Sequence, residues 1–464
     1  MKSTLQVISP IDQSIYVERP YASEQDISTC LELSHAVQNR WKQTALNVRK
    51  ALCRAAVFNL LSQRQAIASE LSWQMGRPIA YAGNELDGLA ERAHYMIDIA
   101  DTALANIQVP PKTGFKRFIK REPLGTCFII APWNYPYLTA VNGIIPALLA
   151  GNTVILKHSA QTPLVAERFF QAFTEAGLPE GVFQFMNLSH THTEQVIQSD
   201  LINQVVFTGS VSGGKQVEKA ALGRFIPICL ELGGKDPAYV RADAKLDYAV
   251  ATTMDGAFFN SGQSCCGIER IYVHRACFDE FIHQSKLLVN QYRLGPADDP
   301  SVTLGPMVSA QAADFVRKQI QEAIKSGATP LIDPTHFDHD KPGTAYLAPQ
   351  ILVNINHQMR IMQEETFGPV VCVMAVDSDE EAIYLMNDSQ YGLTASVFSE
   401  DIDAAVAIGE QVQTGTFFVN RCDYLDPALA WTGVKDSGRG CSLSELGFAT
   451  FTQPKSFHIK QLSK

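Results

Sequence analysis

Residues 204–214 read Gln204-Val205-Val206-Phe207-Thr208-Gly209-Ser210-Val211-Ser212-Gly213-Gly214, which is an apolar strand, a glycine turn and the start of a helix. Similar β-rich runs lie at residues 127–130, 153–157, 182–186 and 226–230, and helix-like segments separate them. Strands and helices that alternate at this spacing form right-handed crossovers around a parallel sheet. The sequence therefore predicts an α/β fold with a doubly wound, Rossmann-type sheet.

Polar residues follow several of these predicted strands. Asn134, Lys157 and Glu231 each lie at or just after the end of a β-rich run, and Gly209 and Ser210 form the glycine turn. Ligands of doubly wound sheets bind at the carboxyl ends of the strands, and amides at a helix N-terminus attract phosphate. Because the turn lacks the GxGxxG pattern, an ordinary βα turn is the alternative to a dinucleotide site.

The remainder of the chain divides into three kinds of segment. Residues 23–105 have helical periodicity, with long stretches at 51–75 and 84–107, whereas residues 114–121 alternate like an exposed strand or arm. Beyond Gly233 further β-rich runs predict a second α/β domain. These runs lie at 238–240, 270–274, 370–373, 396–398 and 416–419.

The bulk composition excludes several classes of function. The net charge of −10 argues against a nucleic-acid partner or an anionic membrane surface. The most apolar window, residues 128–150, contains Pro132, Pro136 and Pro146, so we do not expect it to span a membrane. The N-terminus shows no secretory signal and the ten cysteines form no CxxC pair, which indicates reduced thiols and a cytoplasmic protein. No metal-ligand spacing appears, so no metal site is predicted.

Cys265, Glu231 and Asn134 are the candidate catalytic residues. Cys265 follows Gly262-Gln263-Ser264, and its spacing from those residues distinguishes it from Cys266. A cysteine nucleophile, a carboxylate base and an amide donor together suit covalent chemistry on a carbonyl. The alternatives are an inert buried thiol, a helix-capping carboxylate and a turn asparagine.

Taken together, these motifs resemble the aldehyde dehydrogenase superfamily over nearly the whole chain. The matching segments occur in the family's order: Pro132-Trp133-Asn134, Phe207-Thr208-Gly209-Ser210, Glu231-Leu232-Gly233-Gly234-Lys235, Gly262-Gln263-Ser264-Cys265, Glu364-Glu365-Thr366-Phe367-Gly368-Pro369, Asn420 and Gly433-Val434-Lys435-Asp436-Ser437-Gly438.

The resemblance implies a thiohemiacetal and then a thioester on Cys265, an oxyanion held by Asn134 and the Cys265 amide, and a water activated by Glu231. It implies NAD or NADP as cofactor. Glu365 is expected at the nicotinamide ribose, Phe367 near the ring and Lys157 at the adenosine ribose. The full set of cofactor-binding residues expected from the resemblance is Ile130, Trp133, Lys157, Ser159, Ala160, Phe207, Gly209, Ser210, Gly214, Leu232, Glu365 and Phe367.

The resemblance also implies the domain organisation and a self-association. Residues 1–108 and 125–233 would form the NAD(P)-binding domain, and residues 234–450 the catalytic domain. Residues 109–124 and 451–464 would form a small β bridging element that joins copies into a homodimer or a dimer of dimers.

The chain departs from the family pattern after Lys157. The family often has Pro-x-Glu there, with the glutamate binding the adenosine ribose, but this chain has His158-Ser159-Ala160. The missing carboxylate removes a repulsion toward a 2′-phosphate, so we expect NADP to be used at least as readily as NAD. The tail Ala430-Trp431-Thr432-Gly433 also differs from the usual Pro-Phe-Gly-Gly.

The expected aldehyde tunnel is aromatic and lacks the arginine that semialdehyde-specific members often carry where Asn142 stands. A buried carboxylate without a cationic partner is costly, so an apolar or aromatic aldehyde is predicted and succinate semialdehyde is disfavoured. The expected tunnel residues are Tyr135, Thr139, Asn142, Ser264, Cys266, Tyr424, Leu425 and Trp431.

Three other functions stay open at this point. A coenzyme A-acylating relative would usually lack the glutamate, and a non-catalytic binding protein of the same fold would tolerate loss of Cys265, Glu231 or Asn134. A Cys–His hydrolase would need a histidine beside Cys265, and the closest in sequence is His274.

Overall fold

The first sheet has the predicted parallel core. The computed structural model describes residues 4–462, and the sheet has the order β19-β9-β8-β5-β6-β7. Its parallel strands are β5 (Thr126–Ala131), β6 (Thr153–His158), β7 (Phe183–Phe185), β8 (Gln204–Thr208) and β9 (Ile228–Glu231). Ile130 pairs with both Lys157 and Phe207, and Thr208 pairs with Glu231. The prediction of a doubly wound sheet is therefore confirmed, and its polar strand ends share one edge.

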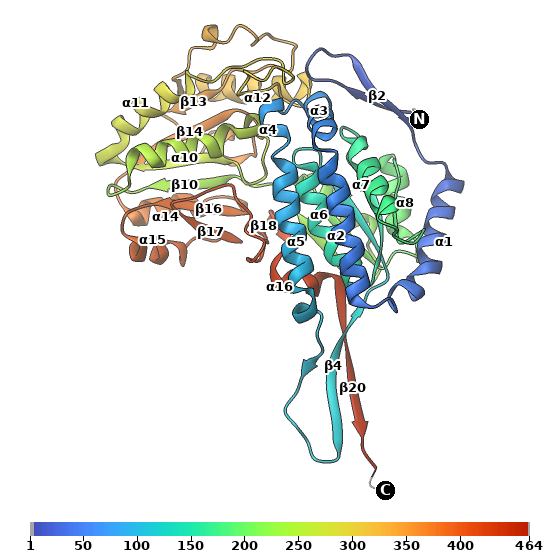
Figure 1. The fold of residues 1–464 in the computed structure, drawn as a ribbon. Helices are drawn as coiled ribbons and strands as arrows, with labels where there is room; N and C mark the ends of the chain where they lie inside the picture. The colour runs from blue at the N-terminus through green and yellow to red at the C-terminus, as the bar shows by residue number, and fades with distance from the viewer. Residues whose placement is uncertain (1–3, 463–464) are drawn as a thin grey trace.

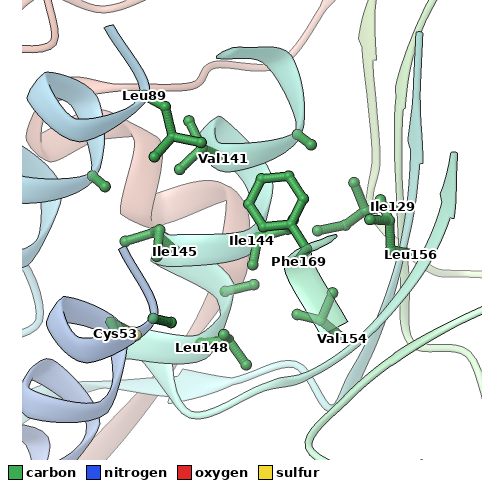
Figure 2. Close-up of a cluster of buried hydrophobic side chains, with 14 of the residues drawn as sticks. Cys53, Leu89, Ile129, Val141, Ile144, Ile145, Leu148, Val154, Leu156 and Phe169 are labelled. Carbon is green, nitrogen blue, oxygen red and sulfur yellow. The ribbon is translucent and has the colours of Figure 1, made fainter. Parts of the chain in front are cut away.

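Helices cover both faces of this sheet because its strands are apolar on both sides. Ile129, Val154 and Leu156 belong to a core with Ile144 and neighbours on α6 (Figure 2), whereas alternate strand residues pack on the opposite face with α1, α8 and α9. Each large apolar side chain buried in this way contributes about 1.5–3 kcal/mol. The helices are α1 (Glu24–Trp41), α2 (Leu46–Ser62), α3 (Arg64–Met75), α4 (Ile79–Ala82), α5 (Glu85–Ala103), α6 (Pro136–Ala150), α7 (Pro163–Glu175), α8 (His190–Gln198) and α9 (Val211–Ala220).

The second sheet lies beside the first and confirms the predicted second α/β unit (Figure 1). It has the order β12-β13-β14-β11-β10-β16-β17, and all its pairs are parallel except β12 with β13. Its strands are β10 (Asp236–Val240), β11 (Ile268–His274), β12 (Thr329–Pro330), β13 (Gln350–Val353), β14 (Val370–Val376), β16 (Thr394–Phe398) and β17 (Thr416–Val419). Its helices are α10 (Leu246–Phe258), α11 (Phe278–Val289), α12 (Ala310–Lys325), α13 (Arg360–Gln363), α14 (Asp379–Asn387) and α15 (Ile402–Gly409).

A two-stranded arm projects from the body, as predicted from the alternation at residues 114–121. It consists of β4 (Phe115–Pro123) and β20 (Thr452–Lys460), which pair antiparallel (Figure 1). The short β3 (Ile107–Gln108) pairs antiparallel with the middle of β4. Phe118 stacks on Phe457 with ring centroids 4.7 Å apart. The structure also contains an N-terminal hairpin, β1 (Thr4–Ile8) and β2 (Ile15–Pro20), that the sequence pattern did not predict.

Near its end the chain returns to the first sheet. The two-stranded pair β15 (Tyr391–Gly392) and β18 (Val434–Lys435) precedes β19 (Gly438–Arg439), which pairs antiparallel with β9. Then α16 (Ser444–Gly447) packs on α5. This return brings Trp431 and its bridge partner Ser442 toward the end of β9. Within residues 4–462, no helix is long and apolar enough to cross a bilayer.

Candidate active site

Cys265 is presented by a strained turn after α10. Asn260, Ser261 and Gly262 in the short helix η1 (Phe259–Gly262) all have positive φ angles, of 53°, 57° and 70°. A Cβ at Gly262 would lie 2.1 Å from the Gly368 carbonyl oxygen, so this position requires glycine. Residues held in sparsely populated backbone regions are frequent at functional sites, and here the strain directs Cys265 into a cavity.

Cys265 lies where two cavities meet. The larger has a volume of about 530 Å³ and the smaller about 220 Å³. Cys265, Glu231, Thr139, Thr208 and Leu232 line both of them. A group in either cavity can therefore reach the thiol and the carboxylate.

Cys266 differs from Cys265 in its surroundings. Cys266 is buried and lines only the smaller cavity, where its Sγ donates to Asp423 Oδ1 at 2.9 Å. The neighbouring Cys265 and burial raise the pKa of the Cys266 thiol well above its usual range. Since the thiolate is the nucleophilic form, Cys266 is the poorer candidate.

Glu231 ends β9 and is nearly buried. The Thr208 hydroxyl donates to Glu231 Oε2 at 3.2 Å, and the Gly209 amide donates to the Glu231 backbone carbonyl at 3.0 Å. Burial raises the pKa of the Glu231 carboxyl above its ordinary value. A carboxylate with a raised pKa is a stronger base, as activation of water requires.

Asn134 lies close to the Cys265 loop and is held there by a buried network. Its Nδ2 donates to the Gln263 carbonyl at 3.2 Å, and its own carbonyl accepts from Asn260 Nδ2 at 3.2 Å and from Arg77. Arg77 forms a buried ion pair with Glu85. An asparagine amide has two N–H donors, so one remains available for an oxyanion.

The Arg77–Glu85 pair also supports the start of α6. Glu85 Oε1 accepts from the backbone amides of Tyr137 at 2.7 Å and Leu138 at 3.2 Å, which have no partner within the helix. Sequence reasoning missed Arg77, Glu85 and Asn260. Two charges near a helix start look like ordinary surface residues until their burial is known.

Glu365 and the glycines at the end of β9 form one wall of the larger cavity. The Gly234 amide donates to Glu365 Oε1 at 3.1 Å, and burial raises the pKa of Glu365 to about 8. A Cβ at Gly233 would lie 2.3 Å from Glu365 Oε2, so the carboxyl group fits only beside glycine. The ring of Phe367, nearby, meets Trp133 edge-on with centroids 5.7 Å apart.

A second buried ion pair positions this wall. Lys235 pairs with Glu269, and Glu269 accepts from the backbone amides of Thr366 and Phe367, each at 2.9 Å. The Lys235 Nζ also donates to Thr366 Oγ1 at 3.0 Å. Glu269 was not predicted, because it lies just before the β-rich run at residues 270–274 and has no motif around it.

The expected cofactor residues fall into two groups. Trp133, Gly209, Ser210, Leu232, Glu365 and Phe367 line the larger cavity. The others lie outside its wall, along the same sheet edge or on α9. Ile130, Lys157 and Phe207 lie near the ends of their strands, Ser159 and Ala160 follow β6, and Gly214 lies on α9, where a Cβ would be 2.7 Å from Leu232.

These residues fit a nicotinamide dinucleotide. Ser210 caps α9 by accepting from the Gly213 amide at 3.1 Å, so the N-terminus of α9 faces the cavity wall at Gly209 and suits a diphosphate. Lys157 has no ion pair within residues 4–462, and burial lowers its pKa to about 8. Glu365 supplies a buried acceptor for ribose hydroxyls.

His158 contributes no positive charge to this edge. Its Nε2 contacts the Pro136 carbonyl at 3.3 Å and its Nδ1 contacts the Thr162 hydroxyl at 3.1 Å. Burial lowers the pKa of His158 to about 3, so the ring is neutral and packs against the start of α6. Beside Lys157, His158 therefore offers no second cation for a 2′-phosphate.

The smaller cavity holds most of the expected tunnel residues. Tyr135, Thr139, Asn142, Ser264, Cys266, Leu425 and Trp431 line it. Tyr424 does not: its hydroxyl donates to Glu91 at 2.7 Å, and Arg421 lies 3.7 Å from its ring centroid. Asp423, which has a positive φ of 47°, lines the cavity in its place.

Charged residues in this cavity were missed by sequence reasoning. Asp423 Oδ1 accepts from Ser264 Oγ at 3.1 Å as well as from Cys266, and burial raises its pKa to about 6. Arg92 lines the cavity from α5 and is only 8% exposed. Arg92 is three residues after Leu89 and four before Met96, so it falls on a helix face that is otherwise apolar and buried. This spacing is the sequence signal that could have indicated Arg92.

Two further predictions can be compared with the described residues. In residues 4–462 no group of His, Cys, Asp and Glu has the arrangement of a metal site. Of the histidines in the same part of the chain, none lines either cavity beside Cys265, so the Cys–His hydrolase gains no support.

Comparison with known proteins identifies the relatives of this arrangement. The sequence profile of the aldehyde dehydrogenase family matches residues 1–457. The mitochondrial aldehyde dehydrogenase of Leishmania tarentolae is 32% identical, over 99% of this chain and 92% of that protein. The NADP+-dependent succinate-semialdehyde dehydrogenase of Deinococcus radiodurans is 34% identical, over 95% of this chain and 92% of that protein.

A solved structure agrees with the fold. The betaine aldehyde dehydrogenase of Staphylococcus aureus in complex with NAD+ superposes with a TM-score of 0.93 at 28% identity, covering 100% of this chain and 93% of that one.

Proposed function

The chain belongs to the aldehyde dehydrogenase family and is an NAD(P)-dependent aldehyde dehydrogenase, and we propose that Cys265, Glu231 and Asn134 carry its chemistry. The observation that supports this assignment is the position of Cys265 and Glu231 in the walls of both cavities. An aldehyde in the smaller cavity and a nicotinamide in the larger would meet at the same thiol.

The proposed first step is attack of the Cys265 thiolate on the aldehyde carbon. The new carbon–sulfur bond moves the carbonyl electron pair onto oxygen, and the free N–H of Asn134 together with the Cys265 amide stabilises that oxyanion. Such a donor contributes about 2.7–4 kcal/mol to transition-state stabilisation. A bound nicotinamide supplies the hydride acceptor, and loss of hydride leaves a thioester on Cys265.

The proposed second step is hydrolysis of that thioester. Glu231 takes a proton from water, the hydroxide adds to the acyl carbon, and the carbon–sulfur bond breaks to release the carboxylic acid and the Cys265 thiolate, while the proton from water stays on Glu231. The raised pKa of Glu231 favours this role.

Two variants test the assignment of the nucleophile. Cys265→Ala should lower aldehyde oxidation by about 10⁴-fold or more while nucleotide binding persists. Cys266→Ala should retain oxidation. The reverse result would show that Cys266 is the nucleophile, and activity in both variants would contradict covalent catalysis.

Each of the three alternative functions can be tested directly. Glu231 favours hydrolysis over transfer to coenzyme A, so adding coenzyme A should produce no acyl thioester. A non-catalytic binding protein would oxidise no aldehyde with either nucleotide. Hydrolase activity without any nucleotide, at rates above those with aldehyde and nucleotide together, would favour a hydrolase.

We also propose that NADP is used at least as readily as NAD. The support is the missing carboxylate at Ala160 and a Lys157 without an ion-pair partner in the described residues. The relatives include one named for NADP+ and one solved with NAD+. A kcat/KM ratio that clearly favours NAD would contradict the proposal.

The arm of β4 and β20 supports the proposal that copies of the chain form a homodimer or a dimer of dimers. Strand β20 is largely exposed and lies at the edge of the sheet β20-β4-β3, where it is available for pairing, whereas β4 is mostly half-buried. The ten cysteines are unpaired, which suits the cytoplasm. Mass measurement in solution with and without residues 452–462 would test the association.

The substrate is best argued from the cavity. Tyr135, Leu425 and Trp431 offer the apolar surface behind the expected preference for apolar or aromatic aldehydes, but Arg92 and Asp423 make the cavity charged. The named relatives act on succinate semialdehyde in one case and betaine aldehyde in the other, which carry opposite charges. An aldehyde panel of matched length and different charge therefore separates the possibilities.

A further inference from the structure

Arg92 occupies an unusual position on α5. The inward face of this helix carries Leu89, Ala93 and Met96, which are fully or almost fully buried in the core. Arg92 lies on the same face, is 8% exposed, and lines the smaller cavity. A charged residue is therefore directed into the substrate side of the active site.

The guanidinium of Arg92 has few partners in the protein. Its Nη1 donates to the Leu138 carbonyl at 2.9 Å, and none of the ion pairs within residues 4–462 includes it. Burial lowers the pKa of Arg92, although an arginine stays charged in proteins. A buried charge without a direct ion-pair partner is costly, so Arg92 would gain from an anionic partner.

None of the carboxylates that line this cavity forms an ion pair with Arg92. Asp423 accepts from Ser264 and Cys266, Glu231 accepts from Thr208, and Asp255 is exposed on α10. Asn142, in the same wall as Arg92, has a buried Oδ1 without a hydrogen-bond partner in the described residues. Its amide can turn to present the N–H groups to an anion, because O and N occupy nearly the same space.

We propose that Arg92 binds the carboxylate of a short-chain oxo acid, with Asn142 as a second donor, and that the physiological aldehyde carries such a group. This inference rests on the proposed function, since it names the substrate class of the same site. Arginine's planar fork matches the two oxygens of a carboxylate better than it matches a single charge. Arg92, Cys265 and Glu231 line the same cavity of about 220 Å³, and this small volume favours a short chain between the two ends of the substrate.

This proposal reverses the substrate preference expected from the sequence. Succinate semialdehyde was disfavoured because no arginine stands at position 142. The structure places an arginine in the same cavity from a different helix, so the compensating charge is present.

Kinetics on a charge series provide the first test. Succinate semialdehyde, pentanal and 4-trimethylammoniobutanal have similar length and charges of −1, 0 and +1. The wild-type enzyme should prefer the anion, and Arg92→Met should lower kcat/KM for it by about 10²-fold, with pentanal changed by less than about threefold. For the anionic aldehyde, the kcat/KM of Arg92→Lys should lie between the values of the wild-type enzyme and Arg92→Met. Arg421→Met is the matched control, because it removes a positive charge that lies over the Tyr424 ring and does not line the cavity.

Two kinetic outcomes would overturn the proposal. An equal loss for pentanal in Arg92→Met would show that Arg92 acts on the catalytic groups rather than on the substrate carboxylate. A wild-type preference for the cation would show that the acidic residues of the cavity select the substrate.

A binding measurement separates this inference from the proposed function. Succinate binding to Cys265→Ala, measured by calorimetry with nucleotide present, should weaken about 10²-fold when Arg92→Met is added. Unchanged binding would overturn the role of Arg92 even if the wild-type enzyme oxidises aldehydes. If the wild-type enzyme oxidised none of the three aldehydes but succinate binding still depended on Arg92, only the proposed function would be contradicted.

Discussion

Replacing Gly233 by alanine should separate nucleotide binding from the rest of the fold. The new Cβ would lie 2.3 and 2.4 Å from the two Glu365 carboxyl oxygens. Normal carbon–oxygen contact requires the carboxyl to withdraw by about 1 Å, and a displacement of that size in an active site can cost about 10²-fold. The movement also breaks the 3.1 Å hydrogen bond from Gly234 to Glu365.

The expected effect is on affinity for the nucleotide. Because the raised pKa of Glu365 keeps its carboxyl largely neutral at pH 7, this hydrogen bond contributes about 0.5–1.5 kcal/mol, which corresponds to about 2- to 13-fold in Kd. We therefore expect Gly233→Ala to raise the Kd for the preferred nucleotide by about that factor. Quenching of tryptophan fluorescence on titration with NADP or NAD measures it, since Trp133 lines the same cavity.

The control is Gly83→Ala, at the residue that follows α4. A Cβ there would meet Arg64 at 3.6 Å, an ordinary contact, and Gly83 lines neither cavity. The Kd of Gly83→Ala for the nucleotide should match that of the wild-type enzyme. If Gly233→Ala binds nucleotide as tightly as Gly83→Ala, the placement of Glu365 at the ribose is wrong.

Further expectations concern the buried groups. Glu85→Gln leaves Arg77 charged and unpaired, which should cost about 3–5 kcal/mol in the free energy of unfolding, and the double variant with Arg77→Met should recover part of it in urea titrations. Additive losses would show that the pair is not coupled. Hydrolysis of the thioester needs ionised Glu231, so its single-turnover rate should rise with pH through a midpoint above 4.5, and a midpoint at or below that value would contradict the effect of burial. His158 has a pKa of about 3 in the folded chain and about 6.5 when unfolded, so its contribution to stability is present above pH 6.5 and is lost as pH falls toward 3. His158→Gln should therefore lose less stability than the wild-type protein between pH 7 and pH 5, and an identical loss would indicate that other groups govern acid unfolding.

Local patterns were sufficient for most of the fold. Strands such as β5 and β8 are short apolar runs between helix-like segments, and that alternation is encoded within about thirty residues. Of the missed elements, β1, β2 and β12 lie at edges with many exposed side chains, so their pattern is weak. The missed β13 is largely buried but has only four residues, too few for a clear pattern.

The site shows the same division at the level of single residues. Cys265, Glu231 and Asn134 stand in motifs that can be read from the linear chain, so the sequence alone was enough to name them. The support beneath them, Arg77 with Glu85, was invisible because a charged side chain has no recognisable role until its burial and partner are known.

Arg92 shows why the charge of the substrate cavity could be determined only from the three-dimensional structure. The sequence determined that an arginine lies on an apolar helical face, but helix packing sets whether that face meets core, solvent or a cavity. Contacts between α5, α6 and the loop at Asp423 join residues more than three hundred positions apart, and only their folding together gives the cavity its charge.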